Sequence, residues 1–328
     1  MDQLYIIVPC YNEEEILECG TLQVLKEKIE LLILDKKISS RSRILFVDDG
    51  SKDRTLEILQ KASQSDPVFS YLSFSRNFGH QSALLAGLFF AEEHGADVMI
   101  SIDADLQQDI NAMDEFLEKF KNGGADIVYG VRNSRNTDSI LKKCTAQFFY
   151  DFMNLLGCEI IRNHADYRLM SAKAVQALKG YKEVNLFLRG LVPFLGFPSD
   201  VVYFNVSERK AGTSKYTAKK MINFALDGIT SLSMKPVRWI TAAGAAVFLL
   251  SFLLVVYSFI SNLTGATVSG WTSIIISIWA LGGMELMAVG IVGEYVGKTY
   301  MEAKGRPRYI IKEYKCDSEK ILTNCKGK

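Results

Sequence analysis

The stretch MISIDADLQQD (Met99–Asp109) decides the fold, because in it a hydrophobic run ends on two aspartates that stand one residue apart. Like charges this close repel one another unless something positive lies between them. In an extended chain alternate side chains point the same way, so Asp103, Asp105 and Gln107 can all face one pocket. Two carboxylates and an amide oxygen form a hard, oxygen-only site. We therefore expect these three residues to bind Mg²⁺ or Mn²⁺, with the diphosphate of a ligand on the open side of the ion.

Outward from this stretch, short apolar strands alternate with amphipathic helical segments from the first residues to about Arg209. The expected strands are LYIIVPC (Leu4–Cys10), RILFVDD (Arg43–Asp49), FSYLSFS (Phe69–Ser75), DVMISID (Asp97–Asp103) and ADIVYGV (Ala125–Val131). The expected helices are Glu14–Leu34, Thr55–Ser63, Gln81–His94 and Ile110–Asn122. Strands that are apolar along their whole length are typical of a parallel sheet covered on both faces. The pattern predicts an α/β domain over residues 1–209 with a Rossmann-like, mostly parallel sheet.

Polar residues follow four of these strands. They form the clusters Tyr11-Asn12-Glu13, Asp48-Asp49-Gly50-Ser51, Ser75-Arg76-Asn77 and Asp103 to Gln107. In α/β sheets, ligands bind at the carboxyl ends of the strands, so we expect the four clusters to share one edge. A DxD pair alone is a weak signal, and its position beside three other polar strand ends makes it a strong one.

Charge and cysteine content narrow the class of protein. The chain of 328 residues has a formal net charge of +1, which gives no basic field for nucleic-acid binding. Its start, MDQLYIIVPCYNEEE, is acidic and its apolar run is too short for a signal peptide. The six cysteines show no metal-binding spacing. This favours a reducing compartment without a disulfide framework.

A second feature of the chain is a long uncharged run. Between Trp239 and Met284 there is no Asp, Glu, Lys or Arg, and the run is roughly twice the ~20 residues that cross a bilayer. We expect two transmembrane helices within residues 237–298, joined by a tight turn. The alternative is a buried helical hairpin in a large soluble core, but such helices seldom stay uncharged on every face.

Charges on both sides of this run predict its orientation. The flanking basic residues are Lys235, Arg238, Lys298, Lys304, Arg306 and Arg308, and the connecting turn SNLTGATVSG has no charge. The positive-inside rule then places both termini and the α/β domain in the cytoplasm, with residues 299–328 as a cytoplasmic tail. Glu285 would lie deep in the second span, where protonation or pairing is the favoured interpretation. Glycines in the same span allow close helix–helix approach and permit a homo-oligomer.

Residues 210–236 lie between the two parts. In this segment Lys215, Lys219 and Lys220 alternate with apolar residues in helical order. A basic amphipathic helix just before a membrane span is typical of a helix at the interface, with its lysines toward anionic headgroups. An ordinary surface helix of the globular domain is the alternative.

Six motifs in order resemble family 2 glycosyltransferases. They are IIVPCYNEEE, FVDDGSKDRT, SRNFGHQSALLAG, DADLQQD, DYRLMSAKAV and ERKAGTSKY. Within that family the chain most resembles the polyprenyl-phosphate glycosyltransferases, the group of dolichol-phosphate mannose synthase and the bactoprenol glucosyltransferases. The resemblance covers essentially the whole chain. It implies a GT-A fold that binds a nucleotide sugar, and inverting transfer to a polyprenyl phosphate at the bacterial cytoplasmic membrane, in the modification of cell wall or surface polysaccharide.

The resemblance also implies binding roles for individual residues. Pro9, Tyr11 and Glu13 would line the nucleoside pocket, and Val47, Asp48 and Asp49 would hold base and ribose. Asp103, Ala104 and Asp105 would bind the donor, with both aspartates on the metal and Gln107 completing its shell. Arg132 would lie near the phosphates. Arg209 and Lys215 would bind phosphate charge of donor, acceptor or both, the guanidinium bidentately and the lysine as a point charge.

Several of these residues have a simpler interpretation. Pro9 and Tyr11 could be turn and packing residues, and Asp48, Asp49 and Asp53 could cap the helix that begins near Arg54, as Asp53 is expected to do. Arg209 and Lys215 could be headgroup anchors only. Arg76, Asn77 and His80 could cap a helix or touch the donor. Asp166 and Arg168 in DYRLM are read first as an internal ion pair that shapes the acceptor side.

A lipid phosphate acceptor simplifies the expected mechanism. Its second pKa is near 6, so it is largely dianionic at neutral pH and needs no strong general base. Metal and basic side chains would offset the charge that develops on the leaving group, and inversion would turn an α-linked donor into a β-linked product. UDP-glucose is the first donor to test, while UDP-N-acetylglucosamine, modified arabinose donors and GDP-mannose stay open. The competing functions are extension of a glycolipid or polysaccharide and a non-catalytic membrane scaffold.

Overall fold

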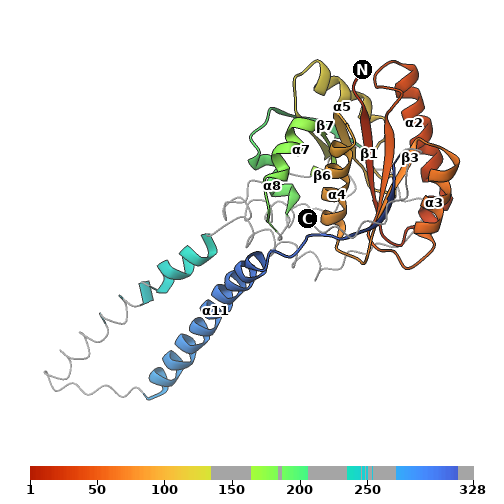
Figure 1. Ribbon diagram of the computed structural model, residues 1–328. Coiled ribbons are helices and arrows are strands. Elements are labelled where there is room, and N and C mark those ends of the chain that lie inside the picture. Colours follow the sequence, from red (N-terminus) through yellow and green to blue (C-terminus); the bar gives the residue numbers. More distant parts are fainter. Residues whose placement is uncertain are drawn as a thin grey trace, which may run out of the picture.

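The computed structural model describes residues 1–133, 164–183, 187–205, 235–244, 246–247, 249, 253 and 271–316. Across these ranges the chain forms an eight-stranded sheet in the order β7-β5-β6-β4-β1-β2-β3-β8 (Figure 1). The strands are β1 (Leu4–Cys10), β2 (Arg43–Asp48), β3 (Phe69–Phe74), β4 (Val98–Ser101), β5 (Ile127–Arg132), β6 (His164–Ser171), β7 (Ser199–Phe204) and β8 (Ile311–Lys315).

The sheet is mixed and mostly parallel. Strand β1 pairs in parallel with β2 and β4, β2 with β3, and β5 with β7. Strand β6 is antiparallel to both β4 and β5, and β8 is antiparallel to β3. The α/β class and the mostly parallel sheet that the sequence predicts are thus confirmed. The carboxyl ends of the parallel strands and the first residues of β6 meet at one edge.

Helices cover both faces of the sheet (Figure 1). The first helical stretch consists of α1 (Glu14–Ile16), the π-helical segment Leu17–Thr21 and α2 (Leu22–Leu34). Further helices are α3 (Thr55–Ser65), α4 (His80–Glu93), α5 (Ala112–Lys121), α7 (Ala172–Lys179), α8 (Leu188–Phe194) and α11 (Trp271–Ala303), and residues 235–244 are also helical. The predicted helix Glu14–Leu34 is therefore interrupted, because Gly20 has a φ of 105° inside it.

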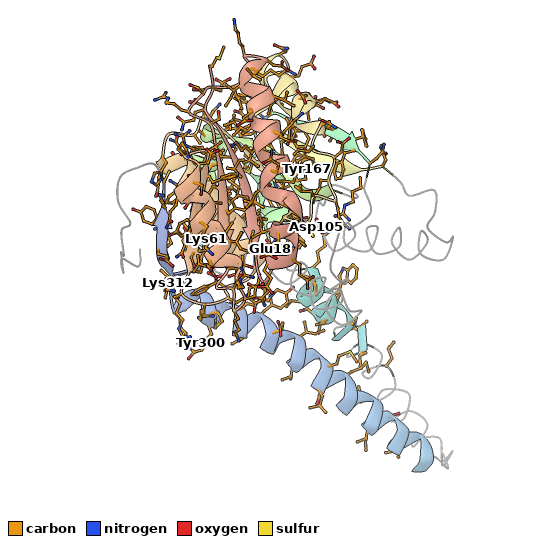
Figure 2. All side chains as sticks on the ribbon, turned by 90° about the vertical axis from the view of Figure 1, so that its right-hand side faces the viewer. Glu18, Lys61, Asp105, Tyr167, Tyr300 and Lys312 are labelled. Carbon is orange, nitrogen blue, oxygen red and sulfur yellow. The ribbon has the colours of Figure 1, made fainter. Side chains whose placement is uncertain are left out.

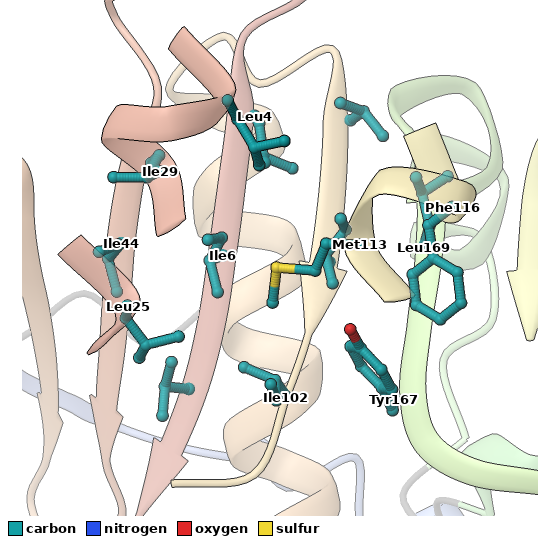
Figure 3. Packing of buried hydrophobic residues seen from close by; sticks show 14 of the residues in the cluster. Leu4, Ile6, Leu25, Ile29, Ile44, Ile102, Met113, Phe116, Tyr167 and Leu169 are labelled. Carbon is teal, nitrogen blue, oxygen red and sulfur yellow. The ribbon is translucent and has the colours of Figure 1, made fainter. Parts of the chain in front are cut away.

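Two hydrophobic cores lie on opposite faces of the sheet, because alternate strand residues point to opposite sides. Leu4 and Ile6 of β1 pack with α2, α3 and α5, as Figure 3 shows for Leu25, Met113 and Phe116. Their neighbours Tyr5 and Ile7 pack with α4, α7 and α8 on the other face. Burial on both faces explains why the strands are apolar along their whole length.

One glycine sets how closely a helix approaches the sheet. A Cβ on Gly87 of α4 would lie 2.4 Å from Cγ2 of Ile7 in β1. Only a residue without a side chain fits at this distance, so α4 packs directly over the central strand. This close contact brings the N-terminus of α4, and with it His80, to the carboxyl edge of the sheet.

The last described segments form a long helix and a returning strand. Helix α11 projects from the carboxyl-edge side of the α/β body, with its first residues far from the body and its C-terminal end beside it, and the chain then continues to β8, which pairs with β3 (Figure 1). In Figure 2, Asp105 lies on the half of the body that faces α11, and Tyr300 marks the end of α11 next to that body. None of the helices in the described ranges has both the length and the apolar character needed to cross a membrane.

Candidate active site at the carboxyl edge of the sheet

The polar clusters predicted at the strand ends gather at one edge of the sheet. Strands β1, β2, β3 and β4 run in the same direction, and their ends carry Cys10, Asp48, Phe74 and Ser101. The loops that follow bring Asp49, His80 and Asp103 to this edge. Strand β6 runs the opposite way and adds Asp166 near its start, because Arg168 pairs with Ser101.

Asp103 and Asp105 of DADLQQD lie in a turn that closely follows β4. Ile102 still donates its N–H to the carbonyl of Ile7 (3.0 Å), and the turn begins at Ala104. Leu106 adopts a φ of 47°, and its N–H donates to the carbonyl of Asp103 (3.2 Å). The hydroxyl of Thr21 donates to the carbonyl of Ala104 (3.1 Å). The turn is therefore fixed by the backbone, and the extended conformation assumed for residues 103–107 does not occur.

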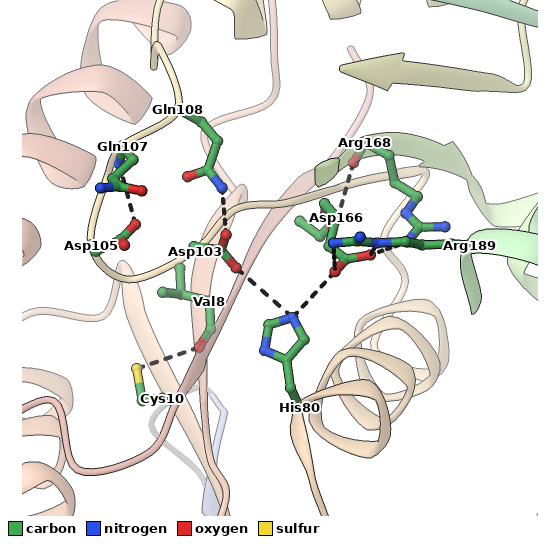
Figure 4. A network of polar contacts seen from close by, with 11 residues as sticks. Val8, Cys10, His80, Asp103, Asp105, Gln107, Gln108, Asp166, Arg168 and Arg189 are labelled. Carbon is green, nitrogen blue, oxygen red and sulfur yellow. Dashed lines mark hydrogen bonds and ion pairs between the residues drawn. The ribbon is translucent and has the colours of Figure 1, made fainter. Parts of the chain in front are cut away.

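This turn changes which glutamine contacts which aspartate. Gln107, which we expected beside the two carboxylates, donates its backbone N–H to Oδ1 of Asp105 (3.2 Å). The side chain of Gln108 donates from Nε2 to Oδ2 of Asp103 instead (Figure 4). Strand alternation misses Gln108, because the left-handed residue Leu106 shifts the residues after it out of that pattern.

Asp103 has a histidine on its other side. Nε2 of His80 lies 3.8 Å from Oδ1 of Asp103 and 3.7 Å from Oδ2 of Asp166 (Figure 4). His80 is the first residue of α4, and 45% of its side chain is exposed. Asp103 is thus held between an amide and an imidazole.

Asp166 is bound by two arginines. Nη2 of Arg168 donates to Oδ1 of Asp166 (2.9 Å), and Arg189 donates from Nη2 to Oδ2 (2.9 Å) and from Nε to Oδ1 (3.2 Å). Arg168 lies within β6, while Arg189 comes from α8. The interpretation of Asp166 and Arg168 as an internal ion pair agrees with this geometry, and Arg189 is a third member that the sequence reading missed.

The network shifts two pKa values in opposite directions. Burial acts to raise the pKa of Asp166, but Arg189, His80 and Arg168 outweigh it and hold that pKa well below its ordinary value. Burial acts to lower the pKa of His80, and the carboxylates of Asp166 and Asp103 outweigh it, so that this pKa is raised. Asp166 is therefore ionised and fully engaged, which makes it a poor proton acceptor.

Asp48 is the last residue of β2 and Asp49 follows it, and the carboxylates of both accept hydrogen bonds from the neighbouring loops and strand. Asp48 accepts hydrogen bonds from the Ser51 N–H (3.0 Å) and the Ser73 hydroxyl (2.8 Å). Asp49 accepts from the N–H groups of Phe78 (2.6 Å) and Gly79 (2.9 Å), directly before His80. The expected contacts of these two acids with a nucleoside therefore stay a prediction, beside a structural role that is visible.

The loop of Asp49 also needs a glycine. Gly50 has a φ of +66°, and a Cβ on it would lie 2.4 Å from the backbone carbon of Arg76. The guanidinium of Arg76 lies 4.0 Å from the ring centre of Phe78 and donates to the Asn77 carbonyl (3.1 Å). The two loops are therefore packed together, and Arg76 stabilises the loop that carries His80.

Asp53 acts as expected at the start of α3. Its carboxylate accepts from the N–H of Thr55 (3.0 Å) and from the N–H of Glu14 (3.2 Å). Burial acts to raise the pKa of Asp53, and these hydrogen bonds outweigh it and lower the pKa. The acid thus ties the first turn of α3 to the loop after β1.

The remaining predicted site residues lie in different parts of the chain. Pro9 and Val47 are paired neighbours within the buried strands β1 and β2, while Tyr11 and Glu13 are half-buried in the loop after β1. Arg132 is the last residue of β5 and is exposed, on the same edge of the sheet as Asp103. Arg209 and Lys215 lie outside the described residues, as does most of the predicted amphipathic segment 210–236.

The donor atoms at Asp103 and Asp105 fit a hard divalent cation. Both carboxylates offer oxygen, the ligand that Mg²⁺ and Mn²⁺ prefer. Beside them the side-chain oxygen of Gln108 is buried and has no hydrogen-bond partner among the described residues. Within those residues no group of three or more His, Cys, Asp and Glu side chains is placed to hold a metal by itself. A cation here would therefore take further ligands from water or substrate.

Comparison with known proteins identifies the family. Residues 5–178 match the family "Glycosyl transferase family 2", and the chain belongs to it. The match spans β1 to α7 and so includes the DADLQQD turn, His80 and Asp166. The resemblance to this family that was inferred from the six motifs is confirmed.

Relatives match along nearly the whole chain. The "Uncharacterized glycosyltransferase YkoT" of Bacillus subtilis (strain 168) is 49% identical over 94% of this chain and 90% of that protein. The "Bactoprenol glucosyl transferase" of Shigella phage SfV is 40% identical over 95% of this chain and 99% of that protein. The structure of glucosyl-3-phosphoglycerate synthase from Mycobacterium tuberculosis gives a TM-score of 0.44 at 14% identity, covering 70% of this chain and 78% of that one.

Proposed function

We propose that this family 2 glycosyltransferase moves a hexose from a nucleotide sugar to a polyprenyl phosphate at the cytoplasmic face of a membrane, with inversion. The observation that carries the proposal is the 40% identity to the bactoprenol glucosyl transferase of phage SfV, which extends over 99% of that protein. An identity that spans both the α/β part and the C-terminal part favours a shared acceptor as well as a shared fold. Glucose and UDP are the first sugar and nucleotide to test.

The position of the site supports an acceptor that arrives from a membrane. Asp105 of the carboxyl edge lies on the half of the body that faces α11 (Figure 2). Along α11, large apolar side chains are exposed, among them Leu286, Met287 and Val289 at 67% or more. Exposed apolar surface of this extent suits contact with lipid. We propose that residues 237–298 cross the membrane twice, as the uncharged run in the sequence indicates.

The charges at the edge support a mechanism without a general base. An acceptor phosphate is largely dianionic at neutral pH, and so it can attack the anomeric carbon directly. Asp166 is engaged by Arg168 and Arg189, which agrees with a site that has no need to remove a proton. In this scheme the basic side chains, with Arg132 beside the phosphates, would offset charge on the nucleoside diphosphate leaving group.

Asp103 and Asp105 would hold a divalent cation in this reaction. When bound, the cation would neutralise charge on the donor diphosphate and make it a better leaving group. The chain itself contributes the fixed turn, the carboxylates and the hydrogen bonds that orient them. Binding of the sugar donor and the acceptor at one edge would hold the acceptor phosphate close to the sugar and in the orientation needed for attack.

A donor screen tests the proposal. Purified protein in detergent would receive undecaprenyl phosphate, Mn²⁺ or Mg²⁺, and one nucleotide sugar at a time, with lipid-linked sugar phosphate detected by mass spectrometry. We expect one donor to give a product that EDTA abolishes. The proposed acceptor would be wrong if a donor were hydrolysed or bound while no lipid-linked product formed, and a glycolipid acceptor would be tested next.

A further inference from the structure

We propose that Gln108 is a positioning residue that fixes the Asp103 carboxylate for cation binding, opposite His80. The inference rests on the proposed function, because it concerns the cation that the reaction would use. It assigns a role to a residue outside the predicted ligand set Asp103, Asp105 and Gln107. Gln108 would act through Asp103 and would make no contact with the sugar or the acceptor.

The first observation is the orientation of the Gln108 amide. Gln108 is 2% exposed, and its Nε2 donates to Oδ2 of Asp103 (Figure 4). A carboxylate only accepts hydrogen bonds, so the nitrogen and not the oxygen of the amide must face Asp103. This leaves Oε1 buried without a hydrogen-bond partner among the described residues.

An unpaired buried amide oxygen is unusual, because such groups lose their hydration without compensation. Its position beside a cation-binding carboxylate gives a reason for it. Because the amide nitrogen donates to Asp103, this contact sets the orientation of the amide and leaves the oxygen facing the protein interior. Residues that hold metal ligands from behind commonly donate hydrogen bonds to the ligating carboxylates in this way.

The second observation is that the backbone around Gln108 is fixed. The hydroxyl of Tyr167, a fully buried side chain, donates to the carbonyl of Asp109 (3.0 Å). At the other end of the loop, the Leu106 N–H donates to the Asp103 carbonyl (3.2 Å). The loop therefore presents the Gln108 amide to Asp103 before any cation arrives.

The third observation is that the opposite side of Asp103 is fixed as well. His80 lies between Asp103 and Asp166, and Asp166 is held by Arg168 and Arg189. Asp49 in turn accepts from the two N–H groups that precede His80. Gln108 and His80 thus hold the carboxylate from two sides, and the loss of one should leave Asp103 free to turn.

The test is Mn²⁺ binding, measured without any sugar transfer. Electron paramagnetic resonance would report the free ion in a titration of the full-length protein in detergent, first with Mn²⁺ alone and then with UDP present. Gln108→Met keeps the size of the side chain and removes its amide. We expect this variant to bind Mn²⁺ about 10- to 100-fold more weakly than the unmodified protein, the usual effect of losing a residue that supports a metal ligand.

Two controls separate positioning from folding. The melting temperature of Gln108→Met should be close to that of the unmodified protein, since the unpaired buried oxygen of the amide is removed together with its hydrogen-bond donor, the amide nitrogen. Gln60→Met makes the same chemical change in α3, where Gln60 donates to Glu313 (3.2 Å) far from the turn. That variant should bind Mn²⁺ normally. Weaker binding with unchanged stability is a result that a purely structural role for Gln108 would not produce.

The possible outcomes distinguish this inference from the proposed function. Unchanged Mn²⁺ binding by Gln108→Met would overturn the role of Gln108 and leave the transferase proposal intact. Loss of binding in Gln107→Met with normal binding in Gln108→Met would also overturn it, in favour of the ligand set expected from strand alternation. If the unmodified protein bound no Mn²⁺, with or without UDP, the metal-dependent reaction itself would be wrong, and this inference with it.

Discussion

At the residue scale, the acids of the carboxyl edge fall into two groups with different surroundings. Asp166 accepts from Arg168 and Arg189, and these charges compensate its own within the protein. Asp103 and Asp105 lie on the adjacent turn, where Asp103 contacts the amide of Gln108 and the ring of His80, and Asp105 accepts from the N–H of Gln107. The first arrangement is typical of a structural ion pair. The second places two carboxylates within one turn, which suits the binding of a cation.

Asp105→Asn is expected to abolish transfer while the protein keeps its fold. The change removes one negative charge and one ligand oxygen from the turn, and a lost metal contact of this kind corresponds to a drop in turnover of about 100-fold or more. The backbone N–H of Gln107 can still donate to the amide oxygen that replaces Oδ1. Turnover would be measured with the donor found in the screen. Near-normal activity would contradict the assignment of Asp105 to the cation.

Asp166→Asn is expected to destabilise the protein by about 3–5 kcal/mol, because it leaves the buried guanidinium of Arg168 without its counter-charge. Arg168 is 2% exposed, so water cannot replace the lost partner. Chemical denaturation would measure the free energy of unfolding. Asp200→Asn is the matched control, since Asp200 pairs with Lys119 (3.2 Å) at an exposed position and should cost about 0–1 kcal/mol. Equal effects of the two variants would contradict the prediction.

At the element scale, local sequence patterns predict the helices and strands in the first half of the domain. In the second half, the strands are determined by pairing with residues that are distant in the chain. Strands β1 to β5 and helices α3 to α5 lie close to their predicted bounds, because apolar runs and turn residues mark them locally, while the predicted helix Glu14–Leu34 is interrupted at Gly20. Strand β8 has the sequence IKEYK and becomes a strand only by pairing with β3, which is distant in the chain. The antiparallel course of β6 is likewise not encoded in its own pattern.

The same distinction applies to the candidate site. Asp103 and Asp105 could be found from their place after an apolar strand. For His80 the sequence leaves open whether it caps a helix or touches the donor, and it does not indicate Arg189 or Gln108 at all, because each of the three reaches the site through an arrangement that has no local signature. His80 depends on the close packing of α4, Arg189 on the position of α8, and Gln108 on the left-handed conformation of Leu106.

A buried lysine joins α2 to α5 and makes stability depend on pH. Lys28 of α2 donates to Asp114 of α5, which also accepts from Lys37. Burial acts to raise the pKa of Asp114, but the two ammonium groups outweigh it and hold that pKa below its ordinary value. The ionised carboxylate therefore stabilises the fold above the unfolded-state pKa of about 3.9. This contribution is lost as the pH falls through the lower folded-state pKa.

Asp114→Asn is accordingly expected to lower the free energy of unfolding by about 1–3 kcal/mol at pH 7, since Lys28 loses its charged partner. The difference from the unmodified protein should be constant down to about pH 5 and should shrink below about pH 4. Denaturation at a series of pH values would measure it. Glu115→Gln is the control, because Glu115 and Lys119 form an exposed i,i+4 pair (3.6 Å). A difference independent of pH would contradict the assignment to Asp114.

Strand β8 covers an edge that would otherwise be open. It pairs with β3, and Tyr314 packs edge-on against Phe90 of α4 at 5.2 Å between ring centres. Just before it, Tyr309 stacks on Phe74 at 5.3 Å, and burial raises the pKa of Tyr309 to about 12. Unpaired edge strands promote aggregation, so this covering protects the sheet as well as stabilising it.

A chain that ends after Ile310 is expected to be less stable and to aggregate more than a chain that ends after Cys316. The shorter chain exposes the edge of β3 and loses the contacts of Tyr314, whereas the longer one keeps β8 complete. Thermal unfolding and light scattering of the two proteins in the same detergent would measure the effect. Equal melting temperatures and equal scattering would mean that β8 contributes little to the sheet.

At the scale of the whole molecule, the pairing of β8 with β3 constrains any membrane topology. The two strands are hydrogen-bonded, so the α/β body and residues 311–316 must lie on the same side of a membrane. The chain between β7 and β8 must then cross the membrane an even number of times. The pairing of β8 with β3 and the distribution of lysine and arginine thus favour the same arrangement independently of each other. Two crossings are the even number that fits the uncharged run from Trp239 to Met284.

Reporter fusions would test this topology directly. A fluorescent protein, which matures only in the cytoplasm, is expected to be bright when fused after Lys328. Alkaline phosphatase, which is active only outside the cytoplasm, is expected to be active when inserted in the turn 261–270 and inactive when fused after Lys328. The reason is that the charge-free turn would lie on the far side of the membrane from the basic flanks. A phosphatase inactive at both positions would exclude the two crossings. An active phosphatase after Lys328 would require β8 to leave the sheet, so the two reporters together test the fold and the topology at once.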